Sequence, residues 1–496
     1  MVQQRKNSNL HLKHIQIPLD DLLAQQITAV VDRARFVYIQ QERPRQKSLD
    51  DVAYSARAIV EGLYQAYIGR NKKCKLSIPT SKSGYGKKPY QISTHSHIAV
   101  QRVLESLQHL DWIERTKGFK NKDGDNIPTA IKAKGGLLDA FLQLNYVWRE
   151  MGPINQDVIV LKGYDPKTRL KQAILFDDNR VTNRWRKNLK KYNKFLTQHS
   201  ICLSIENHRL DKLVEQMANA KYQLDWSFGD NKKKPRTFNY LHVQLRRIFA
   251  RGSFEMGGRF YGGWWQFIPS EFRPYITIDG LPTAELDYSE LHPRLMYLEF
   301  KQELPEGDLY DLGVAFRGSE YDKDKEPYQS KRKVVKTYIN ALINDDRGRY
   351  RLTAEQVKII NMDPKEFEQL VFKRHPILSE IKGKGRGLAF QFLDSQIAEY
   401  VMMDLLAKGI VCLPVHDSFI CQEHQKVVLE NAMNEAYEKV FKSSPQLKQS
   451  AEFLTDFEPA FYPSGQLDLT YMKNMYKDSI HDIFLSGYLK YQPRNT

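Results

Sequence analysis

Two aspartates lie at predicted sheet positions where a carboxylate could do chemistry. Asp287 ends a predicted strand just before a helix, so its carboxylate would lie at a sheet edge beside backbone carbonyls. Asp417 lies with His416 in the tight turn of an apolar hairpin, where Asn-Gly or Asp-Gly is usual. Carboxylate and carbonyl oxygens together can bind a divalent cation. A helix N-cap is the structural alternative for Asp287.

Two cations on one predicted helix could bind phosphate groups. The helix begins near Pro327, and Arg332 and Lys336 are four residues apart, so they share one of its faces. Arginine acts as a fork for phosphate oxygens, and lysine acts as a point charge or proton donor. Any basic helix face also produces such a pair by chance. The apolar stripe of this helix would be Val335, Ile339 and Leu342.

The elements that must position these residues follow from turn and periodicity patterns. Asp279-Gly280 indicates a hairpin whose second strand ends at Asp287, and a helix follows. Upstream, Glu255-Met-Gly-Gly-Arg259 has paired glycines, which let the backbone approach a neighbour closely, beside an arginine. We therefore expect a small antiparallel sheet flanked by helices.

Taken in order, these stretches resemble motifs A, B and C of the right-hand nucleic acid polymerases. These are the family A DNA polymerases and the phage-type single-subunit RNA polymerases. Asp287-Tyr-Ser with Arg294 is similar to the DNA-polymerase form of motif A. His416-Asp-Ser-Phe419 is similar to the RNA-polymerase form of motif C, and Phe392-Leu-Asp-Ser-Gln396 resembles the RNA-polymerase version of the preceding helix. Glu255 to Arg259 resembles the Gly-Arg element that both groups place near the template.

The resemblance implies a site for two Mg²⁺ ions, with Mn²⁺ as a substitute. Asp287, Asp417 and the carbonyl of Tyr288 would bind the ions, which would lie about 3.5 to 4 Å apart. Arg332 and Lys336 would bind the β- and γ-phosphates, and Lys336 could protonate the leaving pyrophosphate. The implied partners are DNA, as duplex and as primer–template, and dNTPs, with NTPs as the alternative substrate. The implied reaction is nucleotidyl transfer.

The resemblance covers residues 250 to 440 and also implies contacts with template, primer and sugar. The residues that would touch template or primer are Gly258, Arg259, Asp394, Gln396 and His416. His292 takes the place of the residue that blocks a ribose 2′-hydroxyl in the DNA polymerases. Asn340 and Asn344 replace the aromatic residues of motif B that would brace this gate, so we expect a softened preference for dNTPs. The polar residue with which RNA polymerases sense the sugar falls on Asp394.

The charge of the chain is divided unevenly. The net charge is +16, and residues 1–250 carry 44 Lys and Arg against 23 Asp and Glu. Such a basic half indicates binding of a polyanion, most commonly nucleic acid, and solubility is the alternative. Residues 180–194 contain seven basic residues and no acidic one, with Trp185 and Tyr192 placed to stack on bases or to pack internally. The DNA contacts expected in this segment are Arg184, Arg186, Lys187 and Lys190.

Residues 48–142 resemble a winged helix-turn-helix domain in the order of their elements. Two amphipathic helices precede a basic hairpin whose turn is Asp123-Gly124. In that family the second helix enters the major groove and the wing touches phosphates. The contacts would be Arg102, Lys117, Lys120 and Lys122. A small helical domain with a solvated basic loop is the alternative.

The predicted fold class is α+β. A basic, helical N-terminal half with a winged helix-turn-helix would precede a palm and fingers polymerase core that contains a small antiparallel sheet. Leu241–Phe249 is predicted to be a helix. The expected domains are an arm and helix at 1–47, the winged helix at 48–142, a basic helical, thumb-like region at 143–250, the catalytic core at 251–450 and an extension at 451–496.

Composition excludes several classes of protein. The longest apolar runs are far shorter than a membrane-spanning helix, and the N-terminus lacks a signal-peptide pattern. The four cysteines form no C-x-x-C pair, which predicts reduced thiols. A cytoplasmic, nucleoid-associated protein without a membrane partner is expected.

Three functions remain open from the sequence. The first is a small DNA-directed DNA polymerase, such as a plasmid, phage or mobile element encodes. It would lack proofreading, because no acidic cluster before residue 250 resembles an exonuclease site. The second is a single-subunit RNA polymerase or primase. The third is a DNA-binding replication initiator or regulator whose palm is inert.

Overall fold

The structure is a computed structural model, and it describes most of the chain between residues 157 and 456 together with shorter parts before it. The described ranges are 10–11, 27–33, 46–68, 75–78, 96–120, 126–127, 129–143, 157–164, 171–219, 242–318, 326–348 and 350–456. Most of the predicted arm and most of the C-terminal extension lie outside these residues, as do Lys122 and the Asp123-Gly124 turn. The fold is α+β, with several small sheets and many helices.

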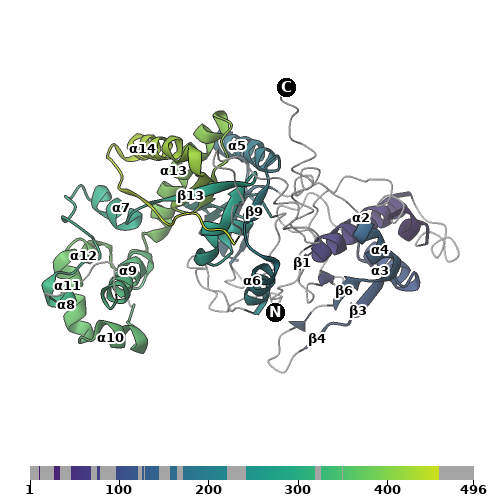
Figure 1. Ribbon diagram of the computed structural model, residues 1–496, viewed down its shortest axis with the longest axis horizontal. Coiled ribbons are helices and arrows are strands. Elements are labelled where there is room, and N and C mark those ends of the chain that lie inside the picture. Colours follow the sequence, from purple (N-terminus) through teal and green to yellow (C-terminus); the bar gives the residue numbers. More distant parts are fainter. Residues whose placement is uncertain are drawn as a thin grey trace.

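The N-terminal elements form one four-stranded sheet with a short helix at residues 27–33 and three longer helices, at the right of Figure 1. The longer helices are α2 (Gln46–Ile68), α3 (His97–His109) and α4 (Gly135–Gln143). The sheet order is β1-β2-β6-β3, with β1 Leu10–His11, β2 Leu76–Ile78, β3 Ile113–Thr116 and β6 Thr129–Ala133. The predicted basic hairpin is confirmed, since β3 and β6 pair antiparallel. A short second ladder joins β4 (Phe119–Lys120) to β5 (Asn126–Ile127).

The next segment is not the helical region that the sequence predicted. Its helices are α5 (Arg180–Leu196) and α6 (Asn207–Asn219), but four strands lie between and around them. These strands are β7 (Ile159–Tyr164), β8 (Lys171–Ala173), β9 (Ile201–Leu203) and β10 (Arg246–Ala250). The helix predicted at Leu241–Phe249 is therefore wrong. A short apolar run is ambiguous between helix and strand, and here pairing with β7 on one side and β11 (Ser253–Tyr261) on the other decides for a strand.

The central sheet has the order β14-β15-β13-β12-β9, and β16 pairs with the end of β13. Its remaining strands are β12 (Ile276–Ile278), β13 (Leu281–Tyr288), β14 (Leu413–Val415), β15 (Ser418–Gln422) and β16 (Leu447–Gln449). Both predicted hairpins are present. Asp279 and Gly280 adopt φ of 53° and 77° in the first turn, and His416 adopts φ of 63° in the second. Such left-handed residues turn antiparallel strands tightly.

Helices surround this sheet, and the group from α8 to α12 lies to its left in Figure 1. The helices are α7 (Leu291–Glu299), α8 (Val314–Arg317), α9 (Tyr328–Asn344), α10 (Ala354–Ile360), α11 (Pro364–Arg374), α12 (Leu378–Ile381), α13 (Gly387–Ala407) and α14 (Lys426–Phe441). Short 3₁₀ turns occupy Trp264–Gln266, Ser270–Tyr275 and Glu423–Gln425. The predicted helix after Pro327 is α9, and its apolar stripe is buried as expected. No helix within the described residues is long and apolar enough to cross a membrane.

A buried arginine joins β10 to three other elements. Arg247 is 1% exposed, and its Nε donates to the carbonyl of Gly258 on β11 at 2.9 Å. On α13, its Nη2 donates to Ser395 Oγ at 3.0 Å and its Nη1 pairs with Glu399 Oε2 at 2.6 Å. Its guanidinium also lies 4.5 Å from the ring centroid of Trp185 on α5. These contacts fix two strands and two helices against one another.

Arg247→Ala should lower the free energy of unfolding by about 3–5 kcal/mol, because the carboxylate of Glu399 would lose its charged partner in a buried site. The measurement is urea denaturation followed by tryptophan fluorescence, since Trp185 reports on this region. Arg184→Ala is the matched control, because Arg184 is exposed on α5, and it should change stability by less than about 0.5 kcal/mol. Equal effects of the two substitutions would contradict the role given to Arg247.

Candidate active site

The two predicted aspartates lie at the same end of the central sheet, Asp287 near the end of β13 and Asp417 in the turn between β14 and β15. Asp287 is opposite Ser418 in the antiparallel pairing of β13 with β15. The N–H of Tyr288 donates to the carbonyl of Asp417 at 3.1 Å. Asp287 does not cap α7, because the N-cap residue of that helix is Glu290. The capping alternative for Asp287 is therefore wrong.

The electrostatics of Asp287 indicate an anionic site that suits a cation. Burial, together with the charge of Asp417, raises the pKa of its carboxyl to about 7. Lys448 and Lys336 act in the opposite direction. Two carboxylates that disfavour each other's charge are stabilised by a bound cation.

The oxygen ligands of this site fit Mg²⁺. The described residues contain no group of three or more His, Cys, Asp or Glu side chains that could hold a metal ion. The groups that could contribute ligands here are the carboxylates of Asp287 and Asp417 and a backbone carbonyl. The neighbouring carboxylate of Glu285 is already engaged, since it accepts from Ser418 Oγ at 2.6 Å and from Arg273 Nε at 2.9 Å. Hard oxygen ligands with few protein groups are typical of Mg²⁺, which keeps its other positions for water and phosphate.

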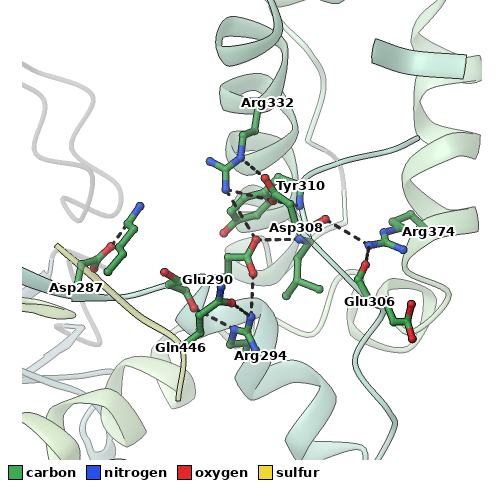
Figure 2. A network of polar contacts seen from close by, with 12 residues as sticks. Asp287, Glu290, Arg294, Glu306, Asp308, Tyr310, Arg332, Arg374 and Gln446 are labelled. Carbon is green, nitrogen blue, oxygen red and sulfur yellow. Dashed lines mark hydrogen bonds and ion pairs between the residues drawn. The ribbon is translucent and has the colours of Figure 1, made fainter. Parts of the chain in front are cut away.

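Helix α9 carries both predicted cations, and one is exposed while the other is paired with a carboxylate. Lys336 is exposed and acts on the charge of Asp287. Arg332 is held by Asp308, which accepts from Nε at 2.5 Å and from Nη2 at 3.1 Å. Figure 2 shows Arg332, Asp308 and Glu290 converging between α7 and α9, apart from Asp287 on β13. An arginine has five N–H donors, so two bonds to Asp308 leave capacity for a phosphate.

Glu290 belongs to this network, although the sequence analysis did not single it out. Its backbone is left-handed, with φ of 55°, and its Oε1 accepts from the N–H of Leu309 at 2.8 Å. Burial, with a hydrogen bond to Asp308, raises the pKa of its carboxyl to about 7. Arg294 lies 3.2 Å from its Oε2. The spacing of four residues between Glu290 and Arg294 was the one pattern that could have indicated this pair.

Three residues that the resemblance assigns to the sugar or the template, Arg259, His292 and Asp394, form a largely buried cluster. Both oxygens of Asp394 accept from Nε of Arg259, at 3.0 and 2.9 Å. His292 Nε2 lies 3.0 Å from Asp394 Oδ2 and 3.0 Å from Arg259 Nη2. Although burial opposes it, the charge of Arg259 and the hydrogen bonds hold the pKa of Asp394 below its usual value. Arg259 is thus engaged within the protein and 9% exposed, so the expectation that it touches template or primer is not supported by its position.

His292 has neighbours in this cluster that the sequence analysis did not predict. His292 is held by Asp394 and Arg259 and lies beside the ring of Phe390, at 6.0 Å between centroids. The two asparagines of α9 contact each other, since Asn344 Nδ2 donates to the carbonyl of Asn340 at 2.7 Å. Arg259 on β11 and Asp394 on α13 are far from His292 in the sequence, so the motif around His292 could not predict these contacts.

The remaining template and primer candidates surround the same cluster. Gly258 adopts φ of 83°, and a Cβ there would lie 2.8 Å from Phe249 and 3.0 Å from Ser395, so the predicted close approach is confirmed. Burial, with the charge of Arg259, lowers the pKa of His416 to about 4. Gln396 is half-buried on α13.

The basic face of α5 is divided between solvent and the protein. Arg184, Lys187 and Lys190 are exposed, as expected for contacts with DNA. Arg186 is not available in the same way, because Asp157 accepts from its Nε and Nη2 at 2.9 Å each and Asp178 accepts at 2.7 Å.

The aromatic residues of α5 serve the core. Trp185 stacks on Phe249 at 5.0 Å between centroids, and the buried hydroxyl of Tyr192 donates to the carbonyl of Cys412. Internal packing is therefore the correct alternative for both rings, and stacking on bases is wrong. In the N-terminal domain Lys117 is exposed and Arg102 is half-buried.

Asp287→Asn should stabilise the protein at pH 8 in EDTA by about 1–3 kcal/mol. The folded-state pKa of about 7 lies above the ordinary value of 3.8, so the folded protein retains a proton that the unfolded chain loses. Ionisation of Asp287 therefore lowers the free energy of unfolding progressively from about pH 4 to pH 7, and this loss is constant above pH 7. Thermal melts from pH 4 to 8 measure it, with Glu255→Gln, an exposed carboxylate, as control. An advantage of Asp287→Asn that does not grow with pH would contradict this account.

Comparison with known proteins adds no relative to this geometry. The candidate site is one aspartate on β13 and one in the turn before β15, with a lysine from α9 and a lysine from β16 acting on the first of them. No known family model matches the chain, and no curated protein matches it.

Proposed function

We propose that this chain is a template-directed nucleotidyltransferase, specifically a small DNA-directed DNA polymerase without proofreading. The observation that carries the proposal is the placement of Asp287 and Asp417 at one end of the central sheet, where Asp287 is opposite Ser418 and Asp417 lies in the turn just before β15. This is the arrangement that the resemblance to the right-hand polymerases implies for motifs A and C. The phosphate-binding helix of motif B corresponds to α9, whose Lys336 acts on Asp287.

The residues of the site have separate tasks in this proposal. Asp287, Asp417 and the carbonyl of Tyr288 would hold Mg²⁺, which when bound neutralises phosphate charge and lowers the pKa of the attacking hydroxyl. Lys336 balances charge on the leaving pyrophosphate and can donate a proton to it. Arg332 binds phosphate oxygens with the donors that Asp308 does not use. Positioning and charge neutralisation suffice because phosphoryl transfer needs little covalent help from the protein.

Binding of DNA is assigned to the basic half of the chain. The order of α2, β2, α3, β3 and β6 supports a winged helix-turn-helix, in which α3 would enter the major groove. The exposed cations of α5 supply a second phosphate-binding surface. Together they would hold duplex DNA or a primer–template near the acidic pair.

Asp287→Asn and Asp417→Asn should each reduce nucleotide incorporation more than about a thousandfold, because either change removes half of the carboxylate ligands. Binding of duplex DNA should stay within about twofold, since the basic surfaces are unchanged. The assay is extension of a labelled primer with dNTPs and Mg²⁺ or Mn²⁺. Asp404→Asn, a change at an exposed carboxylate on α13, is the control and should retain full activity.

Two outcomes of this assay would favour other functions. A mutant that keeps more than a few per cent of activity would reject the two-aspartate assignment. A wild-type protein that binds DNA but incorporates nothing would favour a replication initiator or regulator with an inert palm.

His292→Ala should raise the use of NTPs relative to dNTPs by about tenfold to a hundredfold, because removal of a braced ring opens space for a 2′-hydroxyl. The wild-type enzyme should prefer dNTPs, and more firmly than an unbraced gate would allow, since Asp394 and Arg259 hold the ring. The measurement is the ratio of kcat/KM for dATP and ATP. His424→Ala, at an exposed histidine, is the control. A wild-type enzyme that prefers ATP would favour an RNA polymerase or primase.

A further inference from the structure

A lysine outside all of the sequence motifs lies beside the acidic pair. The Nζ of Lys448 is 3.7 Å from Asp287 Oδ2, and its side chain is 54% exposed. Lys448 is directly opposite Asp287 in the antiparallel pairing of β16 with β13. Opposed residues of neighbouring strands point to the same face of a sheet, so the pairing itself brings this ammonium group to the carboxylate.

Strand β16 is firmly attached at this place. The N–H of Ser289 donates to the carbonyl of Gln446 at 2.8 Å, and the N–H of Ser450 donates to the carbonyl of Glu285 at 2.9 Å. Arg294 also donates to the side chain of Gln446, as Figure 2 shows. At the other end, Lys426 Nζ lies 2.5 Å from Gln449 Oε1. The backbone that carries Lys448 is therefore fixed, while the side chain remains free to extend.

The ion pair with Asp287 does not account for this lysine by itself. A distance of 3.7 Å is too long for a good hydrogen bond, and such an exposed pair contributes little to stability. Among the described residues, Asp287 is the one carboxylate with which Lys448 forms an ion pair. An ammonium group has three donors, so Lys448 can bind a second anion while it remains near the aspartate.

Lys336 approaches Asp287 from a different element. It lies on α9, and it is exposed, without an ion pair among the residues that the structure describes. Asp417 lies on the β15 side of Asp287, whereas Lys448 lies on the β16 side. Two exposed ammonium groups, from helix and edge strand, thus flank a pair of carboxylates. If the carboxylates bind a cation and that cation binds an anion, Lys336 and Lys448 would give the anion two further positive contacts.

We propose that Lys448 is a phosphate-binding residue of this site, supplied by the C-terminal edge strand. The chemistry recognised is a phosphate group, which can belong to a nucleoside triphosphate or to the backbone of the nucleic acid. This inference deepens the proposed function, and only the identity of its phosphate source rests on that function.

Two binding assays without catalysis test the inference on the full-length protein at saturating Mg²⁺. The first uses inorganic tripolyphosphate in calorimetry, and the second uses a fluorescent primer–template in anisotropy. Lys448→Gln should weaken at least one probe about three- to tenfold, and Lys448→Arg should stay within about twofold of wild type. If the nucleic acid probe is the one weakened, its slope of log K against log salt should fall by about one. Lys408→Gln, a charge loss at the end of α13, should change neither probe.

The two arms identify the source of the phosphate. Loss confined to tripolyphosphate assigns Lys448 to the nucleotide, and loss confined to the primer–template assigns it to the backbone. Unchanged binding of both probes by Lys448→Gln overturns the inference, as does a wild-type protein that binds neither. If Lys448→Gln loses binding while the wild-type protein incorporates no nucleotide, the phosphate site stands and the proposed polymerase function fails.

Discussion

The candidate site depends on a sheet register that forces two aspartates together. Because β13 pairs with β15 through Asp287 and Ser418, the turn that carries Asp417 must lie beside the end of β13. Neither carboxylate gains from the other, and burial raises the cost of charging Asp287. Such a carboxylate pair is stabilised by cations, and the structure supplies lysines from α9 and β16 at its margin.

Two buried arginines attach the strands β10 and β11 to helix α13, beside the central sheet. Arg247 and Arg259 lie on neighbouring strands, and both reach α13, one through Glu399 and the other through Asp394. Two charges in a core cost free energy unless each is paired and hydrogen-bonded, as they are here. Such directional bonds fix one arrangement of strand and helix more closely than apolar contacts would. The glycine at 258 makes this possible, because a side chain there would meet α13.

Cations that look alike in the sequence have different states in the fold. Along α5, Arg184 is exposed while Arg186, two residues later, is held by Asp157 and Asp178. Near the site, Lys336 is exposed while Arg332 is held by Asp308. The count of basic residues therefore overstates the number of cations available to a polyanion. A partner would contact the exposed cations, while the paired cations stabilise contacts within the protein.

Local patterns in the sequence were enough to determine the hairpin around Asp279, the helix after Pro327 and the turn that carries Asp417. Their turn residues and apolar periodicity act over a few neighbouring positions, so no distant contact is needed to identify them. Tertiary structure decided the rest. Residues 246–250 form a strand because the distant β7 and the adjacent β11 pair with them. Arg259 is a core residue because Asp394 on α13 is its ion-pair partner, and Lys448 lies beside Asp287 because β16 pairs with β13 in that register. Each of these outcomes depends on partners more than 100 residues apart or on pairing energies that a local pattern does not contain.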